Sequence, residues 1–150
     1  MELTADWVVG FVDGEGCFHV SLNRHDEMTA GYQVLPEFVI VQHERDKQIL
    51  HALKRFFEGG VVRRNHGDRF CLRIRKMSVL QSVVAFFEAH PLKTKKHVDF
   101  RKFRRILYLM GQQRHLERDG LLEIIDIAME MNSTKRPVLE EVKRQLTASG

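Results

Sequence analysis

The sequence predicts an α+β fold in which a helix followed by two strands occurs twice in succession, with further helices after this repeat. Three observations predict it. Apolar residues recur at helical spacing in several segments, polar and apolar residues alternate in two pairs of segments that are typical of hairpins, and three more helical patterns follow Pro91. The predicted order is therefore α, ββ, α, ββ, α, followed by additional C-terminal helices.

The first predicted helix occupies the segment before residues 13–16. Thr4 or Asp6 is suited to cap its start, and its body, residues 7–12, is apolar on almost every side. This pattern is typical of a helix that is buried or paired with another helix. Two glycines flank a glutamate at residues 13–16, so we expect the helix to end there in a tight turn with unusual backbone dihedrals.

Alternation of period two predicts the two hairpins. In the first, Phe18, Val20 and Leu22 alternate with polar residues over 17–23, and a second strand follows over 33–42. The second hairpin joins residues 61–65 to residues 69–76 through a polar turn. Helices are expected at residues 46–57 (ended by Gly59 and Gly60), from Ser78 onward, and at residues 97–111, 120–131 and 138–147.

Length and composition favour one domain over residues 1–150, with residues 112–150 as a C-terminal helical extension. The chain has 150 residues, of which 43% are hydrophobic and 29% charged. No apolar run approaches the roughly 18 to 20 residues of a membrane span, and the N-terminus lacks the basic start of a signal peptide. Two cysteines without a C-x-x-C pair disfavour a disulfide scaffold and a structural zinc site. We expect an intracellular, unsecreted protein.

The distribution of charge points to a polyanionic partner. Lysine and arginine number 24 against 20 aspartates and glutamates, a formal net charge of +4. The basic residues concentrate between positions 63 and 105, and the acidic residues collect at 117–130 and 140–141. Part of the surface should therefore be electropositive.

Each predicted hairpin has one polar face. His19, Ser21 and Asn23 share a face in the first, and arginines dominate the odd positions of the second. A solvated face is the simplest interpretation. The same side chains also supply the donors and acceptors that recognise base edges and phosphates, and a β-ribbon fits the major groove of DNA.

Residues 8–16, Val-Val-Gly-Phe-Val-Asp-Gly-Glu-Gly, resemble the LAGLIDADG motif of homing endonucleases. Val8 and Val9 replace the usual Leu-Ala, and Glu15 takes a position more often held by aspartate, so the acid is kept. A nucleotide-binding glycine loop fits less well, because the third glycine is missing and a strand follows instead of a helix.

The resemblance covers roughly residues 4–130 and implies the αββαββα homing-endonuclease fold with a curved antiparallel DNA-binding sheet. One copy of the motif occurs here, and the resemblance implies that single-copy members are homodimers whose motif helices pack together. Gly10 would let a second helix approach closely. The expected dimer interface consists of Trp7, Gly10, Phe11, Asp13 and Gly14, with Asp13 in a structural role, bonding backbone donors around the paired helix ends.

The resemblance also implies that two Glu15 side chains meet at the centre of the dimer and hold divalent cations, with the Gly14 carbonyl as a further ligand. Two carboxylates side by side repel each other unless a cation stabilises both. Hard oxygen ligands select Mg²⁺, with Mn²⁺ as a possible substitute. Such ions polarise phosphate and lower the pKa of an attacking water, as phosphodiester hydrolysis requires.

Two further polar positions match the family. Gln42, after the second strand, is expected to hold the solvent around the attacking water, and Lys95 is expected to stabilise charge on the phosphate. Lys93 and Lys96 compete for the second role, and ordinary surface lysines are the alternative. The expected DNA-contacting residues lie on the two hairpins and near the C-terminus: His19, Ser21, Asn23, His25, Gln33, Arg63, Asn65, Arg69, Arg73, Lys135 and Arg136.

The resemblance implies a homodimeric homing endonuclease that cuts a long, near-palindromic double-stranded DNA site and leaves short 3′ overhangs. Its gene would lie in an intron or stand free, in a prokaryote or an organelle. One alternative is a non-cleaving relative, either a maturase that binds intron RNA or a DNA-binding regulator. Another is a small basic α+β interaction module, which would show no metal dependence and no dimer through residues 7–14.

Overall fold

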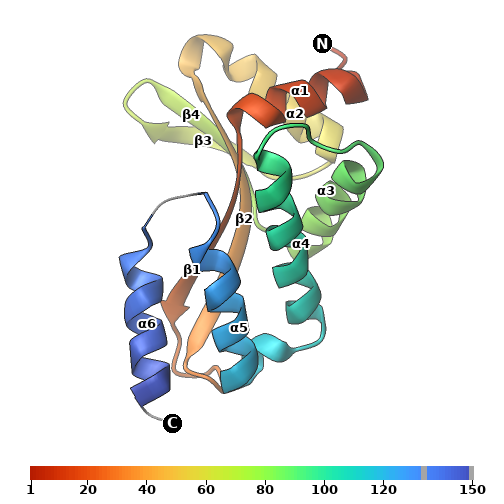
Figure 1. Cartoon of the computed structure of the whole chain (residues 1–150). Coiled ribbons are helices and arrows are strands. Elements are labelled where there is room, and N and C mark those ends of the chain that lie inside the picture. The colour runs from red at the N-terminus through yellow and green to blue at the C-terminus, as the bar shows by residue number, and fades with distance from the viewer. Residues whose placement is uncertain (133–134, 149–150) are drawn as a thin grey trace. The chain divides into compact units, whose positions relative to one another are not determined.

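The structure is a computed structural model that describes residues 1–132 and 135–148, and it confirms the predicted order of elements (Figure 1). Short 3₁₀ helices lie at Glu44–Asp46 and Arg114–Leu116. The other elements are α1 (Ala5–Glu15), β1 (Gly16–Arg24), β2 (Tyr32–His43), α2 (Lys47–Phe57), β3 (Val61–His66), β4 (Arg69–Ile74), α3 (Met77–Ala89), α4 (Lys96–Gly111), α5 (Arg118–Met129) and α6 (Pro137–Ala148).

The four strands form one sheet in the order β1-β2-β4-β3. β2 and β4 pair antiparallel, from Phe38 opposite Ile74 to His43 opposite Arg69. Along β1 and β2, buried side chains alternate with partly exposed ones, as the period-two pattern predicts. Pro36 has no backbone N–H to donate. β2 accommodates it because the pairing of β2 with β4 begins only at Phe38, so no hydrogen bond to β4 is required at Pro36.

The chain divides into two compact units, and strands β1 and β2 run through both. The first unit contains Met1–Phe18 and Glu37–Val98. Its core is a cluster of aromatic rings, in which Phe38 lies 5.0 Å from Phe18 and 6.1 Å from Phe87 between ring centroids. The buried face of α1, with Val8 and Val12 at 0% exposure, belongs to the same unit.

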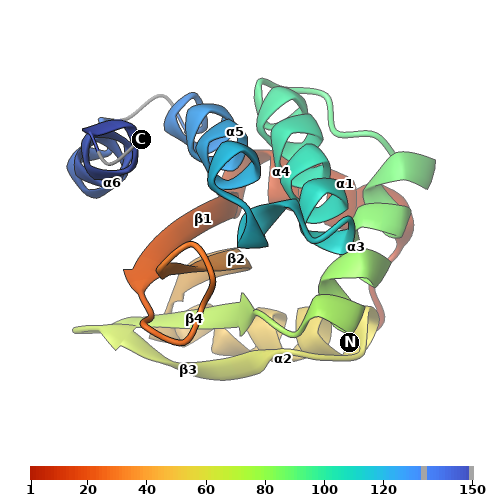
Figure 2. The ribbon, with the colours of Figure 1, turned by 90° about the horizontal axis from the view of Figure 1, so that it is seen from below.

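The second unit contains His19–Pro36 and Asp99–Gly150. In it α5 lies beside the α4 segment that starts at Asp99, and α6 packs on α5 (Figures 1 and 2). The first turn of α5 requires Gly120, because a Cβ atom there would lie 1.9 Å from the Arg114 carbonyl oxygen. In the described ranges, no helix combines the length and hydropathy needed to cross a membrane.

The end of α1 differs from the expected strained turn. Neither Gly14 nor Gly16 adopts a positive φ, and the helix continues to Glu15 before Gly16 enters β1. Gly16 is required by packing instead, because a Cβ atom there would lie 2.7 Å from Val12 Cγ1 and 3.1 Å from the Val12 carbonyl oxygen. The expectation of unusual glycine dihedrals at this turn is therefore wrong.

The second hairpin differs from strict alternation. The β3–β4 register shifts between Arg64 and His66, so that His66 pairs with Arg69 and Asn65 sits in an irregularity of the strand. Arg63 keeps its place opposite Cys71. The sequence pattern alone could not reveal this shift, because it assumes an unbroken ladder.

Candidate functional site

Helix α1 delivers Glu15 to one end of the sheet. The Thr4 hydroxyl caps the helix by accepting a hydrogen bond from the Trp7 amide at 3.2 Å. At the other end the chain turns directly into β1, leaving the Glu15 side chain exposed. Within the described parts of the chain, no hydrogen bond or ion pair engages its carboxylate. Glu15 is thus free to bind a ligand.

Asp13 ties the end of α1 to the loop between α3 and α4. Its carboxylate accepts hydrogen bonds from the Lys93 amide at 2.8 Å, the Thr94 amide at 3.1 Å and the Thr94 hydroxyl at 2.8 Å. Partial burial opposes ionisation of Asp13, but these three donors and the nearby Lys96 ammonium outweigh it and lower its pKa. Asp13 thus bonds backbone donors of this loop, and its expected place at paired helix ends stays a prediction.

The loop anchored by Asp13 carries Lys93 and Lys95, and Lys96 begins α4 directly after it. Lys96 is half-buried, and its ammonium donates to the carbonyl oxygen of Gly16, one residue after Glu15. Lys93 and Lys95 are exposed. The structure therefore places the charged group of Lys96 at the end of the motif.

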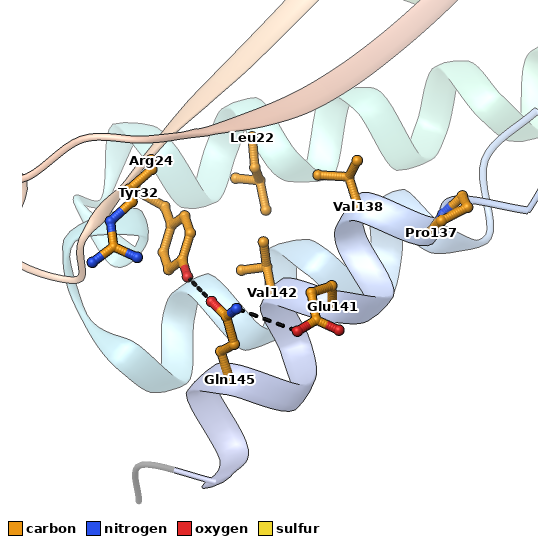
Figure 3. A pocket seen from close by; sticks show the side chains of 8 residues that line it. All are labelled: Leu22, Arg24, Tyr32, Pro137, Val138, Glu141, Val142 and Gln145. Atoms are coloured by element: carbon orange, nitrogen blue, oxygen red, sulfur yellow. Dashed lines mark hydrogen bonds between the residues drawn. The ribbon is translucent and has the colours of Figure 1, made fainter.

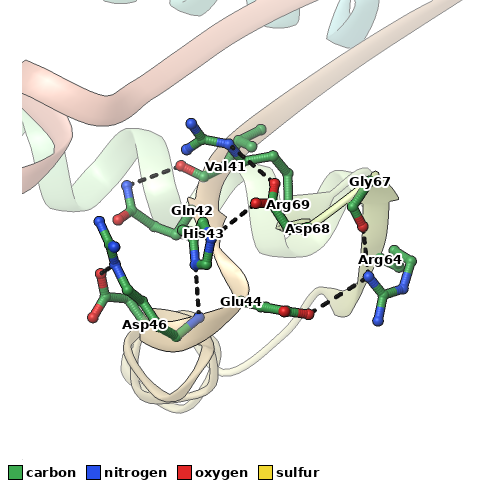
Figure 4. A network of polar contacts seen from close by, with 10 residues as sticks. Val41, Gln42, His43, Glu44, Asp46, Arg64, Gly67, Asp68 and Arg69 are labelled. Atoms are coloured by element: carbon green, nitrogen blue, oxygen red, sulfur yellow. Dashed lines mark hydrogen bonds and ion pairs between the residues drawn. The ribbon is translucent and has the colours of Figure 1, made fainter.

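Gln42 lies at the same end of the sheet. β1 and β2 are adjacent strands joined by one short loop, so the start of β1 and the end of β2 lie side by side. Gln42 precedes the last residue of β2, and its side-chain amide donates to the Val41 carbonyl at 2.9 Å (Figure 4). Glu15, Gln42 and Lys96 therefore belong to one end of the first unit.

The donor set at this end suits a hard divalent cation. It consists of the Glu15 carboxylate and the backbone carbonyls of the last turn of α1, where Gly14 is exposed and has open space on its Cα. The helix C-terminus also carries partial negative charge. Among the described residues, no three His, Cys, Asp or Glu side chains gather into a metal-binding group.

The polar faces of the strands carry most of the expected DNA-contacting residues. In the second unit, His19 and Ser21 are half-buried and Asn23 is exposed, on the strand face opposite buried Val20 and Leu22. His25 and Gln33 are half-buried in the same unit. In the first unit, Arg63, Asn65 and Arg69 are exposed and Arg73 is half-buried.

Arg136 and Lys135 differ in their surroundings. Arg136 donates from Nη2 to the Val20 carbonyl at 2.7 Å and so contacts β1, an edge strand of the sheet. Lys135 is exposed beside a pocket of about 350 Å³ that Ser21 and Asn23 also line. The structure thus brings this pair next to the polar residues of β1, within the second unit.

A network of polar contacts fixes the tip of the second hairpin (Figure 4). His43 Nε2 lies 2.9 Å from Asp68 Oδ2, and His43 Nδ1 accepts from the Arg45 amide at 3.1 Å. The Glu44 amide donates to the Asp68 carbonyl at 2.7 Å, and Arg64 donates to the Gly67 carbonyl at 2.5 Å. No sequence pattern signals this network, because it joins residues far apart in the chain.

The outward face of α1 is exposed rather than buried. Trp7 is 40% exposed and stacks on Phe11, with ring centroids 4.8 Å apart and planes within 12°. Gly10 and Gly14 lie on the same helix, and a Cβ atom on either glycine would have no atom within 4 Å. A pocket of about 500 Å³, lined by Asp6, Gly10, Ala89, Pro91 and neighbouring residues, borders Gly10.

Another pocket, of about 440 Å³, lies between α6 and the strands of the second unit (Figure 3). Apolar side chains from Leu22, Val138 and Val142 line it, and Tyr32 Oη donates to Gln145 Oε1 at 2.6 Å. None of the expected site residues lines this pocket.

The chain belongs to the LAGLIDADG endonuclease family, whose sequence model matches residues 8–107. It is 30% identical over 131 residues to the probable intron-encoded endonuclease 3 of Neurospora crassa, covering 84% of this chain and 24% of that protein. It is 26% identical over 146 residues to the probable intron-encoded endonuclease Cox1-I1b of Schizosaccharomyces pombe, covering 95% of this chain and 37% of that protein. The chain thus spans well under half the length of these curated relatives.

Two solved structures have the same fold. The homing endonuclease I-TnaI superposes with a TM-score of 0.95 at 60% identity, covering 97% of this chain and 99% of that chain. I-SmaMI bound to an uncleaved DNA target in the presence of calcium ions superposes with a TM-score of 0.90 at 29% identity, covering 96% of this chain and 50% of that chain. The expected homing-endonuclease fold is confirmed.

Substitution of Asp13 tests the contact between α1 and the loop that joins α3 to α4. Because the folded-state pKa is lowered, its stabilising contribution is present above the ordinary value of 3.8 and is lost as the pH falls through the lower folded value. We expect Asp13→Asn to reduce the free energy of unfolding by about 1–2 kcal/mol at pH 7 and by less at pH 3. Urea unfolding at both pH values measures this.

The matched control for that test is Asp6→Asn. Asp6 is an exposed carboxylate on the same helix, so the same charge change there should leave the free energy of unfolding nearly constant. Equal losses in the two variants would show that the contacts to Lys93 and Thr94 contribute nothing specific.

Proposed function

We propose that this chain is the DNA-cleaving subunit of a homing endonuclease that cuts a long, near-palindromic double-stranded site. The observation that carries the proposal is the exposed Glu15 carboxylate at the end of the motif helix, at the same sheet end as Gln42 and Lys96. The relatives support it, since they are named probable intron-encoded endonucleases, and I-SmaMI has been seen bound to cleaved DNA. Family resemblance supports short 3′ overhangs.

Glu15 and the Gly14 carbonyl are the residues that would hold Mg²⁺, or Mn²⁺ in its place. When bound, the ion would polarise the scissile phosphate and make an attacking water more acidic. The calcium-containing complex of I-SmaMI supports a divalent ion in this role. The exposed position of Glu15 lets its carboxylate approach a phosphate backbone without displacing an internal partner.

Gln42 and Lys96 act on the groups around the phosphate. The Gln42 amide can orient an attacking water through its carbonyl oxygen while its NH₂ stays on the Val41 carbonyl. The Lys96 ammonium, bound to the Gly16 carbonyl at the end of the motif, can stabilise the charge that develops on the phosphate. Lys95 remains the alternative, because it lies one residue away in the chain.

DNA binding is assigned to the polar faces of the strands. Each unit contributes its own part: the β1 residues His19, Ser21 and Asn23 in the second, and the arginines of β3 and β4 in the first. These side chains supply the donors and acceptors for base edges. Lys135 and Arg136 would contact phosphates beside β1 and add affinity with little sequence information.

We also propose that two copies of the chain associate through the outward face of α1. Trp7 is exposed there and stacks on half-buried Phe11, while Gly10 and Gly14 leave room for a second helix backbone. In a twofold dimer whose α1 helices pack through Gly10 and Gly14, the Trp7–Phe11 pair of one copy would lie against the pocket beside Gly10 of the other.

Substitution of Glu15 tests the catalytic assignment. Glu15→Gln keeps the shape of the side chain but removes the anionic ligand, so we expect cleavage of the preferred DNA site to fall on the order of a thousandfold. Affinity for that site should change only a few-fold. Cleavage assays in Mg²⁺ and binding assays in Ca²⁺ measure the two effects, and Glu88→Gln, an exposed carboxylate on α3, is the control. Retained cutting by Glu15→Gln would exclude this mechanism.

The two lysines can be separated by paired variants. We expect Lys96→Met to lower the cleavage rate by about 10²–10³-fold, because it removes a charge held at the site. Lys95→Met should mainly weaken DNA binding. The slope of the logarithm of the binding constant against the logarithm of the salt concentration should become shallower by about one. Single-turnover cleavage and salt titration measure these effects. The reverse pattern would assign the catalytic role to Lys95.

The association surface is tested at Gly10. A Cβ atom at Gly10 would meet no atom within 4 Å beyond its own stretch of helix, so a side chain can start there within one chain. A leucine side chain would hold a second helix away. We expect Gly10→Leu to sediment as a monomer and to gain about 1 kcal/mol of monomer stability from better helix propensity. Gly111→Leu, at another open helical glycine, should leave the association unchanged. An intact dimer in Gly10→Leu would place the interface elsewhere.

A further inference from the structure

Glu37 joins two arginines on the polar face of the sheet. Glu37 and Arg73 lie on neighbouring strands β2 and β4, and Arg75 follows β4. Arg75 Nε donates to Glu37 Oε2 at 2.7 Å, and Arg73 Nε lies 3.4 Å from the same oxygen. All three residues belong to the first unit.

The register explains why these side chains meet. Val39 pairs with Arg73 across β2 and β4, and continuation of that register brings Glu37 opposite Arg75. Residues at odd positions in both strands face away from the buried side chains of Phe38 and Ile74. Glu37 therefore lies on the face to which the proposed function assigns DNA binding.

The carboxylate lies beneath the arginines rather than in front of them. The Glu37 side chain is 12% exposed, whereas Arg73 is 23% and Arg75 54% exposed. A largely buried carboxylate that contacts two guanidinium groups restricts the orientations of both long side chains. The cluster keeps a net positive charge, so it remains attractive to DNA.

The contacts leave the outer ends of the guanidinium groups available. Arg75 donates to Glu37 through Nε, whereas Arg73 Nε pairs with the same oxygen by charge without forming a hydrogen bond. Among the described residues, no hydrogen bond engages the terminal Nη atoms of either arginine. Two parallel N–H donors on a planar group match the O6 and N7 acceptors of guanine in the major groove. A guanidinium held in one orientation loses less entropy when it forms that pair.

We infer that Glu37 is a specificity-determining positioning residue, which orients Arg73 and Arg75 so that they recognise guanine in the DNA site. The inference rests on the proposed function. It has a consequence that a merely structural carboxylate would not share: loss of the negative charge should raise affinity for arbitrary DNA while lowering discrimination at the guanine positions. Freed arginines would contact phosphates, which carry no sequence information.

The test compares wild type, Glu37→Gln and Glu37→Ala on the DNA site recovered by wild type from a randomised library, with every base pair substituted in turn. In wild type, one or two positions should prefer guanine by about ten- to hundredfold. This preference should shrink in Glu37→Gln and vanish in Glu37→Ala, because glutamine still offers one acceptor oxygen. Binding to unrelated DNA should strengthen. The slope of the logarithm of that binding constant against the logarithm of the salt concentration should become steeper by up to about one.

Three variants control the interpretation. Glu88→Gln makes the same charge change on the exposed surface of α3 and should alter neither property. Arg73→Lys and Arg75→Lys keep the positive charge but lack the planar fork, so at least one should lose the guanine preference. If both keep it while Glu37→Gln loses it, Glu37 contacts the base directly and the inference is wrong.

The remaining outcomes separate the inference from the proposed function. An unchanged base profile in folded Glu37→Gln and Glu37→Ala overturns the inference alone. A wild-type protein that recovers no DNA site from the library overturns the proposed function and the inference with it. Circular dichroism and urea unfolding of each variant establish that the comparison is made between folded proteins.

Discussion

The direct passage of the chain from helix α1 into strand β1 is the constraint on which the site depends. No loop separates Glu15 from Gly16, and Gly16 packs against Val12 at a distance that no side chain would allow. The end of the helix is therefore fixed relative to the start of β1. The Asp13 carboxylate accepts a hydrogen bond from the α3–α4 loop, which fixes that loop to the end of α1. Lys96, directly after the loop, donates to the Gly16 carbonyl. Glu15 is positioned by the backbone of α1 and β1, and the Lys96 ammonium is held by the Gly16 carbonyl.

The polar strand face is organised before any ligand binds. The His43–Asp68 contact and the Glu44 amide hold the tip of the β3–β4 hairpin against the end of β2. Farther along the same strands, Glu37 holds Arg73 and Arg75. Flexible arginines lose conformational freedom when they bind, and prior contacts reduce that loss. The hairpin thus combines positive charge with fixed geometry, as selective rather than general binding to a polyanion requires.

Much of the fold could be predicted from local patterns. The alternation in β1 and the apolar spacing of α2 predict their elements correctly, because each depends on neighbouring residues. The motif located Glu15 by resemblance. Three features required the structure: Gly16 is fixed by packing rather than by its dihedrals, the β3–β4 register shifts near Asn65, and the Lys96 ammonium meets the end of the motif. Each depends on contacts between residues that periodicity does not relate, or on the direction of one side chain.

The most direct test of the proposed function is a selection of cleaved molecules from a randomised double-stranded DNA library with the wild-type chain, run in parallel in Mg²⁺ and in Ca²⁺. We predict double-strand cuts at one near-palindromic site in Mg²⁺, with binding to the same site but no cuts in Ca²⁺. Sequence-specific binding without cleavage in either ion would contradict this prediction. That result would show that the chain keeps the DNA-binding sheet of its family without the chemistry assigned to Glu15.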